Sequence, residues 1–139
     1  MTCSVRFGKR MKPLIENSFY SEVYVALCSL HIQNQVRFYS ELLQTAPLLS
    51  TPTYAEFRLS GLRLAIFVPK AGNESEFRAL TGGSMSLCLE VSDIECAIAR
   101  LKTLGYPPPA GIMNSFHGQE IYAYDPDGNR LILHQSPEV

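Results

Sequence analysis

The sequence predicts an α+β fold in which one strand–helix–strand unit occurs twice. Apolar residues recur at helical spacing in two separate stretches, and a β-prone run precedes each of them. Apolar runs interrupted by glycine turns follow each helical stretch. The two helical stretches superimpose at an offset of 62 residues, which pairs Ile32 with Ile94, Val36 with Ile98, Tyr39 with Leu101, and Leu42 with Leu104. This correspondence predicts a duplicated βαβββ unit, with two curved mixed sheets around a shared cup-shaped cavity.

In the first copy, residues 23–29 are apolar and β-prone and predict a buried strand. Residues 33–44 carry the spacing of an amphipathic helix. Two strands, 54–59 and 62–68, follow a polar connection and are joined by the turn at Ser60-Gly61.

In the second copy, residues 85–91 form the first expected strand. Asp93 is a suitable N-cap for a helix over residues 94–104, and Gly105 closes that helix. His31 occupies the equivalent entry position in the first copy, where it either caps the helix or faces water.

A hairpin of strands 120–124 and 130–134 ends the second copy, around the turn Asp125-Pro-Asp-Gly128. The expected organisation is an N-terminal arm (1–21), a two-module domain (22–135, with modules 22–69 and 84–135 and linker 70–83), and a tail (136–139).

The composition excludes several classes of protein. Of the 139 residues, 46% are hydrophobic and 18% are charged, which argues against disorder. Lys and Arg number 12 against 13 Asp and Glu, so the chain lacks the basic excess of a nucleic-acid binder. No apolar run suits a membrane span, and no apolar segment follows the basic N-terminus as an export signal would require. We therefore expect a cytoplasmic protein, in which Cys28 and Cys88 are small buried residues.

The duplication, together with Asp125-Pro-Asp-Gly-Asn-Arg-Leu131, resembles the vicinal oxygen chelate superfamily. That group includes glyoxalase I, extradiol dioxygenases, and fosfomycin- and bleomycin-resistance proteins. Further similarity lies in Val36-Arg-Phe-Tyr39, in Val91-Ser-Asp-Ile94, and in His117-Gly118 followed by Tyr122-Ala-Tyr124. The resemblance covers residues 22–135.

The resemblance implies four metal-ligand positions in members that use a metal, and these fall on Tyr24, Ala65, Ser86 and Ile132. Ala65 and Ile132 offer no donor atom, whereas a divalent metal needs three or four converging donors. We therefore expect neither the usual metal nor another cofactor.

Strand alternation predicts which side chains face the cup. The expected ligand-binding residues are Tyr24, Cys28, Arg63, Phe67, Ser86, Glu90, His117, Tyr122 and Tyr124. Glu120 and His134 lie on paired strands and are the candidate acid–base pair. The alternatives are ordinary cross-strand packing for the tyrosines and solvation for Glu120, His117 and His134.

Three functions remain open at this point. The first is a metal-free binder of an unknown small molecule, of the bleomycin-resistance type. The second is a lyase, isomerase or dioxygenase-type enzyme of the same superfamily, working through Glu120 and His134 or through an unusual metal site. The third is a structural role with a filled cup. We expect a homodimer, because C2 dimers are the commonest small oligomers and short members of this family usually pair.

Overall fold

The computed structural model describes residues 19–78 and 82–138. The elements in chain order are β1 (Val25–Cys28), α1 (Ile32–Leu43), β2 (Leu49–Ser50), β3 (Tyr54–Leu59), β4 (Leu62–Phe67), the 3-10 turn η1 (Glu74–Phe77), β5 (Gly82–Glu90), α2 (Ile94–Leu104), β6 (Met113–Ser115), β7 (Gly118–Tyr124) and β8 (Asn129–Gln135). They form two mixed four-stranded sheets, ordered β1-β4-β3-β2 and β5-β8-β7-β6. The identical strand order confirms the duplicated βαβββ unit.

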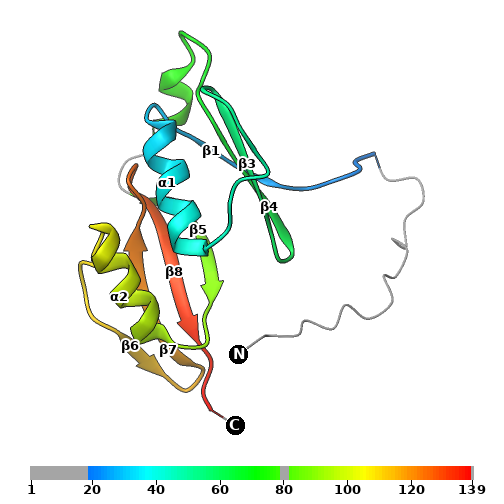
Figure 1. Ribbon diagram of the computed structural model, residues 1–139. Helices are drawn as coiled ribbons and strands as arrows, with labels where there is room; N and C mark the ends of the chain where they lie inside the picture. Colours follow the sequence, from blue (N-terminus) through cyan, green and yellow to red (C-terminus); the bar gives the residue numbers. More distant parts are fainter. Residues whose placement is uncertain (1–18, 79–81, 139) are drawn as a thin grey trace.

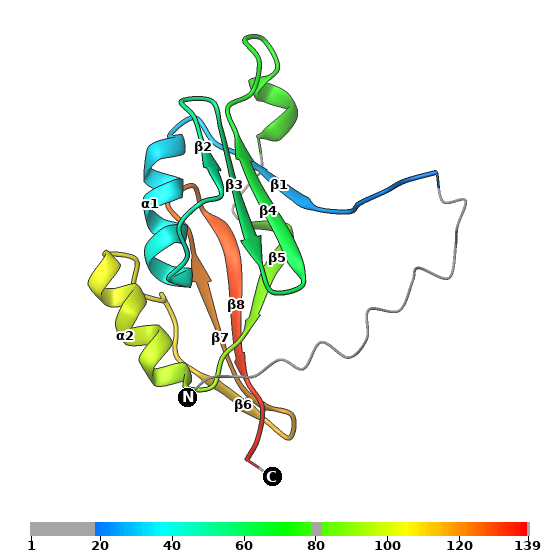
Figure 2. The same cartoon turned by 45° about the vertical axis from the view of Figure 1, so that its right-hand side comes forward.

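Both modules follow the same pairing rules. β1 runs parallel to β4 and β5 runs parallel to β8, whereas the remaining neighbours are antiparallel. The two helices lie on the same side of the molecule (Figure 1). The turned view in Figure 2 shows both helices on the left and the sheets to their right. In the described part of the chain, neither α1 nor α2 covers the opposite face of either sheet.

The core forms where each helix packs on its own sheet. α1 contributes Phe38, Tyr39 and Leu42, and α2 contributes Ile94 and Leu101. Each sheet contributes an aliphatic face, on which Leu64, Ile66, Leu131 and Leu133 are wholly buried. This burial of apolar area is the main stabilising contribution to the fold.

The two helices end in similar ways but begin differently. Asp93 caps α2, because its Oδ1 accepts from the backbone N–H of Cys96 at 3.1 Å. His31 makes no side-chain capping bond and is exposed, which agrees with the second of its two expected placements. At the C-termini, Gly105 and Gln44 both adopt the left-handed conformation, with φ of 91° and 51°.

Asp125 in the β7–β8 turn ties the second module to the first. Its Oδ2 accepts from Tyr39 Oη at 2.7 Å and from Gln35 Nε2 at 3.0 Å, and both donors lie on α1. Three further donors come from its own turn: the backbone N–H groups of Asp127 and Asn129, and Asn129 Nδ2. Burial and the adjacent Asp125 carboxylate raise the pKa of the Tyr39 hydroxyl far above its usual range, so Tyr39 remains a donor.

The structure differs from the sequence-based expectation in several elements. β2, β6 and η1 lie in segments that we expected to be loops, and β5 begins three residues earlier than expected, at Gly82. Cys88 was expected to be buried, and this expectation was wrong, because its side chain is exposed. It lies opposite Ile132 on the sheet face that no helix covers. None of the helices in the described part of the chain is long and apolar enough to span a membrane.

Candidate functional site

A cavity of about 320 Å³ lies along the seam between the two modules. Its walls come from the edge strands β1 and β5, with contributions from α1, β4, η1 and the start of β8. The lining residues are Val25, Ala26, Leu27, Cys28, Tyr39, Leu64, Phe77, Gly83, Ser84, Met85, Ser86, Leu87, Asn129 and Arg130. A concave, mostly apolar cavity of this size is typical of a small-molecule site.

The seam cavity has one charged residue in its wall. Arg130 donates from Nη1 to Ser86 Oγ at 3.2 Å and from Nη2 to the Gly83 carbonyl at 3.0 Å. Both acceptors are neutral, and among the described residues Arg130 takes part in no ion pair. The pairing of β5 with β8 brings these residues together, although they are more than 40 positions apart in the sequence.

Cys28 and Phe77 line another part of the seam cavity. Cys28 lies beside Phe67 in the β1–β4 register, and the Phe67 ring meets that of Phe77 edge to face at 5.1 Å. Partial burial raises the pKa of the Cys28 thiol, and the carboxylates of Asp127 and Glu74 raise it further. The thiol therefore stays protonated at neutral pH and acts as an apolar wall rather than as a nucleophile.

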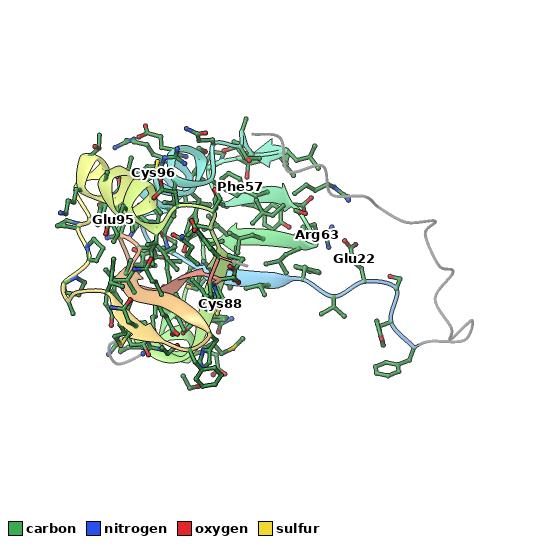
Figure 3. All side chains as sticks on the ribbon, turned by 90° about the horizontal axis from the view of Figure 1, so that it is seen from below. Glu22, Phe57, Arg63, Cys88, Glu95 and Cys96 are labelled. Carbon is green, nitrogen blue, oxygen red and sulfur yellow. The ribbon has the colours of Figure 1, made fainter. Side chains whose placement is uncertain are left out.

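A second cluster occupies the uncovered face of the first sheet. The Arg63 guanidinium lies over the ring of Tyr24, with 4.2 Å between Cζ and the ring centroid. Its two terminal nitrogens lie 3.3 Å from Glu22 Oε2 and 3.4 Å from Glu56 Oε1. Figure 3 shows the Arg63 and Glu22 side chains directed toward each other. Arg63 and Tyr24 are thus brought together, but the protein itself satisfies the arginine charge.

A third cluster lies on the uncovered face of the second sheet. His134 Nδ1 lies 2.6 Å from Glu90 Oε1, and its Nε2 lies 2.8 Å from the His117 carbonyl oxygen. Glu90 Oε2 also accepts from the backbone N–H and the hydroxyl of Ser136. The hydrogen bond to Glu90 raises the pKa of His134, and the same bond lowers that of Glu90. Because both ring nitrogens face acceptors, the arrangement favours the imidazolium form of His134.

The hydrogen bond between Glu90 and His134, which we call the Glu90–His134 clamp, affects whether Glu120 and His134 can act as an acid–base pair. Glu120 lies directly opposite His134 in the β7–β8 register, as the sequence predicted. No hydrogen bond joins the Glu120 and His134 side chains, because Glu90 Oε1 and the His117 carbonyl oxygen engage both ring nitrogens of His134. A general base needs a free nitrogen within reach of the substrate, and His134 has none in this arrangement.

The other expected ligand-binding residues are divided among these clusters. Only Cys28 and Ser86 line the seam cavity. Tyr122 is 39% exposed opposite Ile132, and Tyr124 pairs with Arg130. Phe67 reaches the cavity only through Phe77. The seam cavity thus contains two of the nine expected ligand-binding residues.

The four positions at which the resemblance expects metal ligands do not form a donor set. Tyr24 and Ala65 share a face of the first sheet, and Ser86 and Ile132 share a face of the second; only Ser86 borders the seam cavity. Ser86 Oγ is already engaged by Arg130. Within residues 19–78 and 82–138, no three His, Cys, Asp or Glu side chains converge to hold a metal ion. The residues present do not fit the metal that the resemblance implies.

Sequence reasoning left out Tyr39, Phe77 and Arg130 as site residues. Tyr39 is one of the residues that recur at helical spacing in the first copy, and so it was assigned to the core. Phe77 lies in a polar stretch that looked like a linker. For Arg130 a signal existed, because it lies two and four residues before Ile132 and His134 and so shares one face of β8 with them.

Comparison with known proteins identifies the family. The model of the Glyoxalase/Bleomycin resistance protein/Dioxygenase superfamily matches residues 23–133. The chain therefore belongs to this superfamily, which confirms the resemblance inferred from the sequence. The comparison with curated proteins gave no match.

Solved structures show the same fold. A glyoxalase-related enzyme from Fulvimarina pelagi is 26% identical, with a TM-score of 0.68 over 85% of this chain and 90% of that one. Lactoylglutathione lyase from Agrobacterium tumefaciens is 18% identical, with a TM-score of 0.63 over 84% and 94%. A fosfomycin resistance protein from Listeria monocytogenes, complexed with Mn(II), is 17% identical, with a TM-score of 0.64 over 84% and 90%.

Proposed function

We propose that this protein binds a small molecule in the seam cavity, without a metal in the binding site. The observation that carries the proposal is the cavity itself: about 320 Å³, mostly apolar, and walled by strands of both modules. That volume equals roughly ten water molecules at about 30 Å³ each, which suits a ligand of modest size. β1 and β5 are edge strands, so unpaired backbone groups flank the apolar walls.

Membership of the superfamily supports this proposal but leaves the chemistry open, because a shared fold hosts different functions. The two relatives named as a lyase and as a resistance protein are below 25% identity, so they support the fold alone. We do not favour acid–base catalysis, because His134 is engaged on both sides.

We test binding with indole, an uncharged probe that is small enough for the cavity. In ¹⁵N-labelled protein, indole is expected to shift the amide signals of residues 25–28 and 83–87. The Ala26→Trp variant places a large ring in the cavity and should abolish these shifts. Ala99→Trp is the matched control, because Ala99 is exposed on α2, away from the cavity. Shifts that are absent in the unaltered protein, or that persist unchanged in Ala26→Trp, would contradict the proposal.

We also propose that the protein acts as a homodimer, in which the uncovered sheet faces meet a second copy. Tyr24 and Tyr122 are 47% and 39% exposed on these faces. Large apolar side chains of this kind favour contact with another protein surface.

A further inference from the structure

We propose that the ligand of the seam cavity is a small organic anion, with its acidic group against Arg130 and its apolar body against Cys28 and Phe77. This inference rests on the proposed function and adds to it the chemical class of the ligand. It follows from the single charge in the cavity wall, from the unused donors of that charge, and from the apolar remainder of the lining.

Among the residues that the structure describes, Arg130 has no ion-pair partner, and every ion pair belongs to Arg63 or His134. Burying a charge without a partner is costly, and a guanidinium in a partly buried wall gains most from an anion. No other lining residue carries a charge that could compete for that anion.

The Arg130 guanidinium also has unused hydrogen-bond donors. It presents five N–H groups in a planar fork, and two of them are used on Ser86 Oγ and on the Gly83 carbonyl. These two bonds hold the fork in place without neutralising it. A carboxylate can accept from the remaining N–H groups, and charge-assisted bonds of this kind are stronger than neutral ones.

The carboxylates of Asp127 and Glu74 lie near the cavity and repel an anionic ligand. Their position determines how that ligand is oriented. Asp127 and Glu74 both raise the pKa of the Cys28 thiol, so their field reaches that part of the wall. Both residues are exposed and neither lines the cavity, so water and salt screen them. The acidic head is therefore favoured at Arg130, and the uncharged body at Cys28.

Three probes of matched length separate the possibilities: hexanoate, hexanamide and hexylamine, which carry an anionic, a neutral and a cationic head. We expect hexanoate to bind about tenfold more tightly than hexanamide, the ratio typical of one charge-assisted contact. Arg130→Gln should weaken hexanoate binding by about the same factor and leave hexanamide binding unchanged. Arg58→Gln is the matched control, because Arg58 is exposed on β3 and away from the cavity.

Each outcome decides between the claims. Hexanamide binding as tightly as hexanoate, or hexylamine binding more tightly, would overturn the anion and leave the binding function intact. If none of the three shifts the amide signals of residues 25–28 and 83–87, both the anion and the binding function fail. Unchanged hexanamide binding by Arg130→Gln shows that the cavity of the variant is folded, so weaker hexanoate binding can then be assigned to the lost charge.

Discussion

At the scale of single residues, the buried carboxylate of Asp125 is the group whose replacement should affect stability most. It accepts from five donors, two on α1 and three in its own turn, and the residue is only 3% exposed. A carboxylate that accepts at every position cannot be replaced by a group that also donates, because a donor would then face a donor.

Asp125→Asn is therefore expected to lower the free energy of unfolding by about 3 kcal/mol, the usual cost of breaking a buried charged hydrogen-bond network. Tyr39→Phe, which removes one donor, should cost about 1–2 kcal/mol. Urea denaturation followed by circular dichroism measures both values. Asp127→Asn is the control, since the Asp127 side chain is exposed and should contribute little. Equal effects at positions 125 and 127 would contradict this account.

The clamp between Glu90 and His134 predicts a pH dependence of stability. The pKa of His134 is raised above 6.5, so its stabilisation is complete below 6.5 and disappears as the pH rises through the raised value. The pKa of Glu90 is lowered from 4.5, so its stabilisation is complete above 4.5 and disappears as the pH falls through the lowered value. The clamp is thus strongest between 4.5 and 6.5.

We expect the melting temperature difference between the unaltered protein and His134→Gln to be larger at about pH 5.5 than at about pH 8.5. His31→Gln is the control, because His31 is exposed and makes no capping bond. In an NMR titration, Glu90→Gln should return the pKa of His134 toward its ordinary value. An unaltered titration of His134 in that variant would refute the clamp.

At the scale of elements, the two helices differ in the residue that directly follows their last turn. Gln44 and Gly105 occupy equivalent left-handed C-terminal positions, and only glycine adopts that conformation without steric cost. Gln44→Gly should therefore raise the free energy of unfolding by about 0.5–1 kcal/mol, whereas Gly105→Ala should lower it by about 1 kcal/mol. Urea denaturation of both variants tests the comparison, and a Gly105→Ala variant as stable as the unaltered protein would contradict it.

The elements also show how far the sequence could predict the structure. Residues 54–59 and 94–104 match β3 and α2 because periodicity and turn residues mark both ends. β2 and β6 were missed because strands of two and three residues carry no periodicity of their own and form through pairing with β3 and β7. Strands as short as β2 and β6 can be identified only from their pairing with a neighbouring strand.

The site was harder to predict than the fold for a related reason. Alternation assigns Arg63 and Phe67 to one face of their strand, but it does not define how the two modules meet. The seam cavity depends on that contact between modules, and on the irregular pairing of β5 with β8 between Gly82 and Leu87. No local sequence pattern encodes either feature, so Arg130 was not predicted as a site residue.

At the scale of the whole molecule, the uncovered sheet faces predict association. Light scattering should give twice the 15.5 kDa mass of one chain, because exposed apolar residues lie on or beside both faces. Tyr122→Lys should shift the mass toward that of one chain, since a charge would then be buried between copies. Lys102→Ala on α2 is the control. A single-chain mass at high concentration for the unaltered protein would exclude the dimer.

The tie from Asp125 to α1 runs in one direction only, and this makes the halves of the duplication unequal. At the offset of 62 residues, Gln35 and Tyr39 correspond to Ala97 and Leu101, which are apolar, and the matching turn of the first module is Ser60-Gly61. The carboxylate of the second module thus depends on two donors that only the first module supplies. Within the residues that the structure describes, the first module contains no carboxylate that depends on donors from the second module in the same way. The copies are no longer interchangeable: doubling the second would leave Asp125 without its donors on α1, and doubling the first would leave Gln35 and Tyr39 without their acceptor.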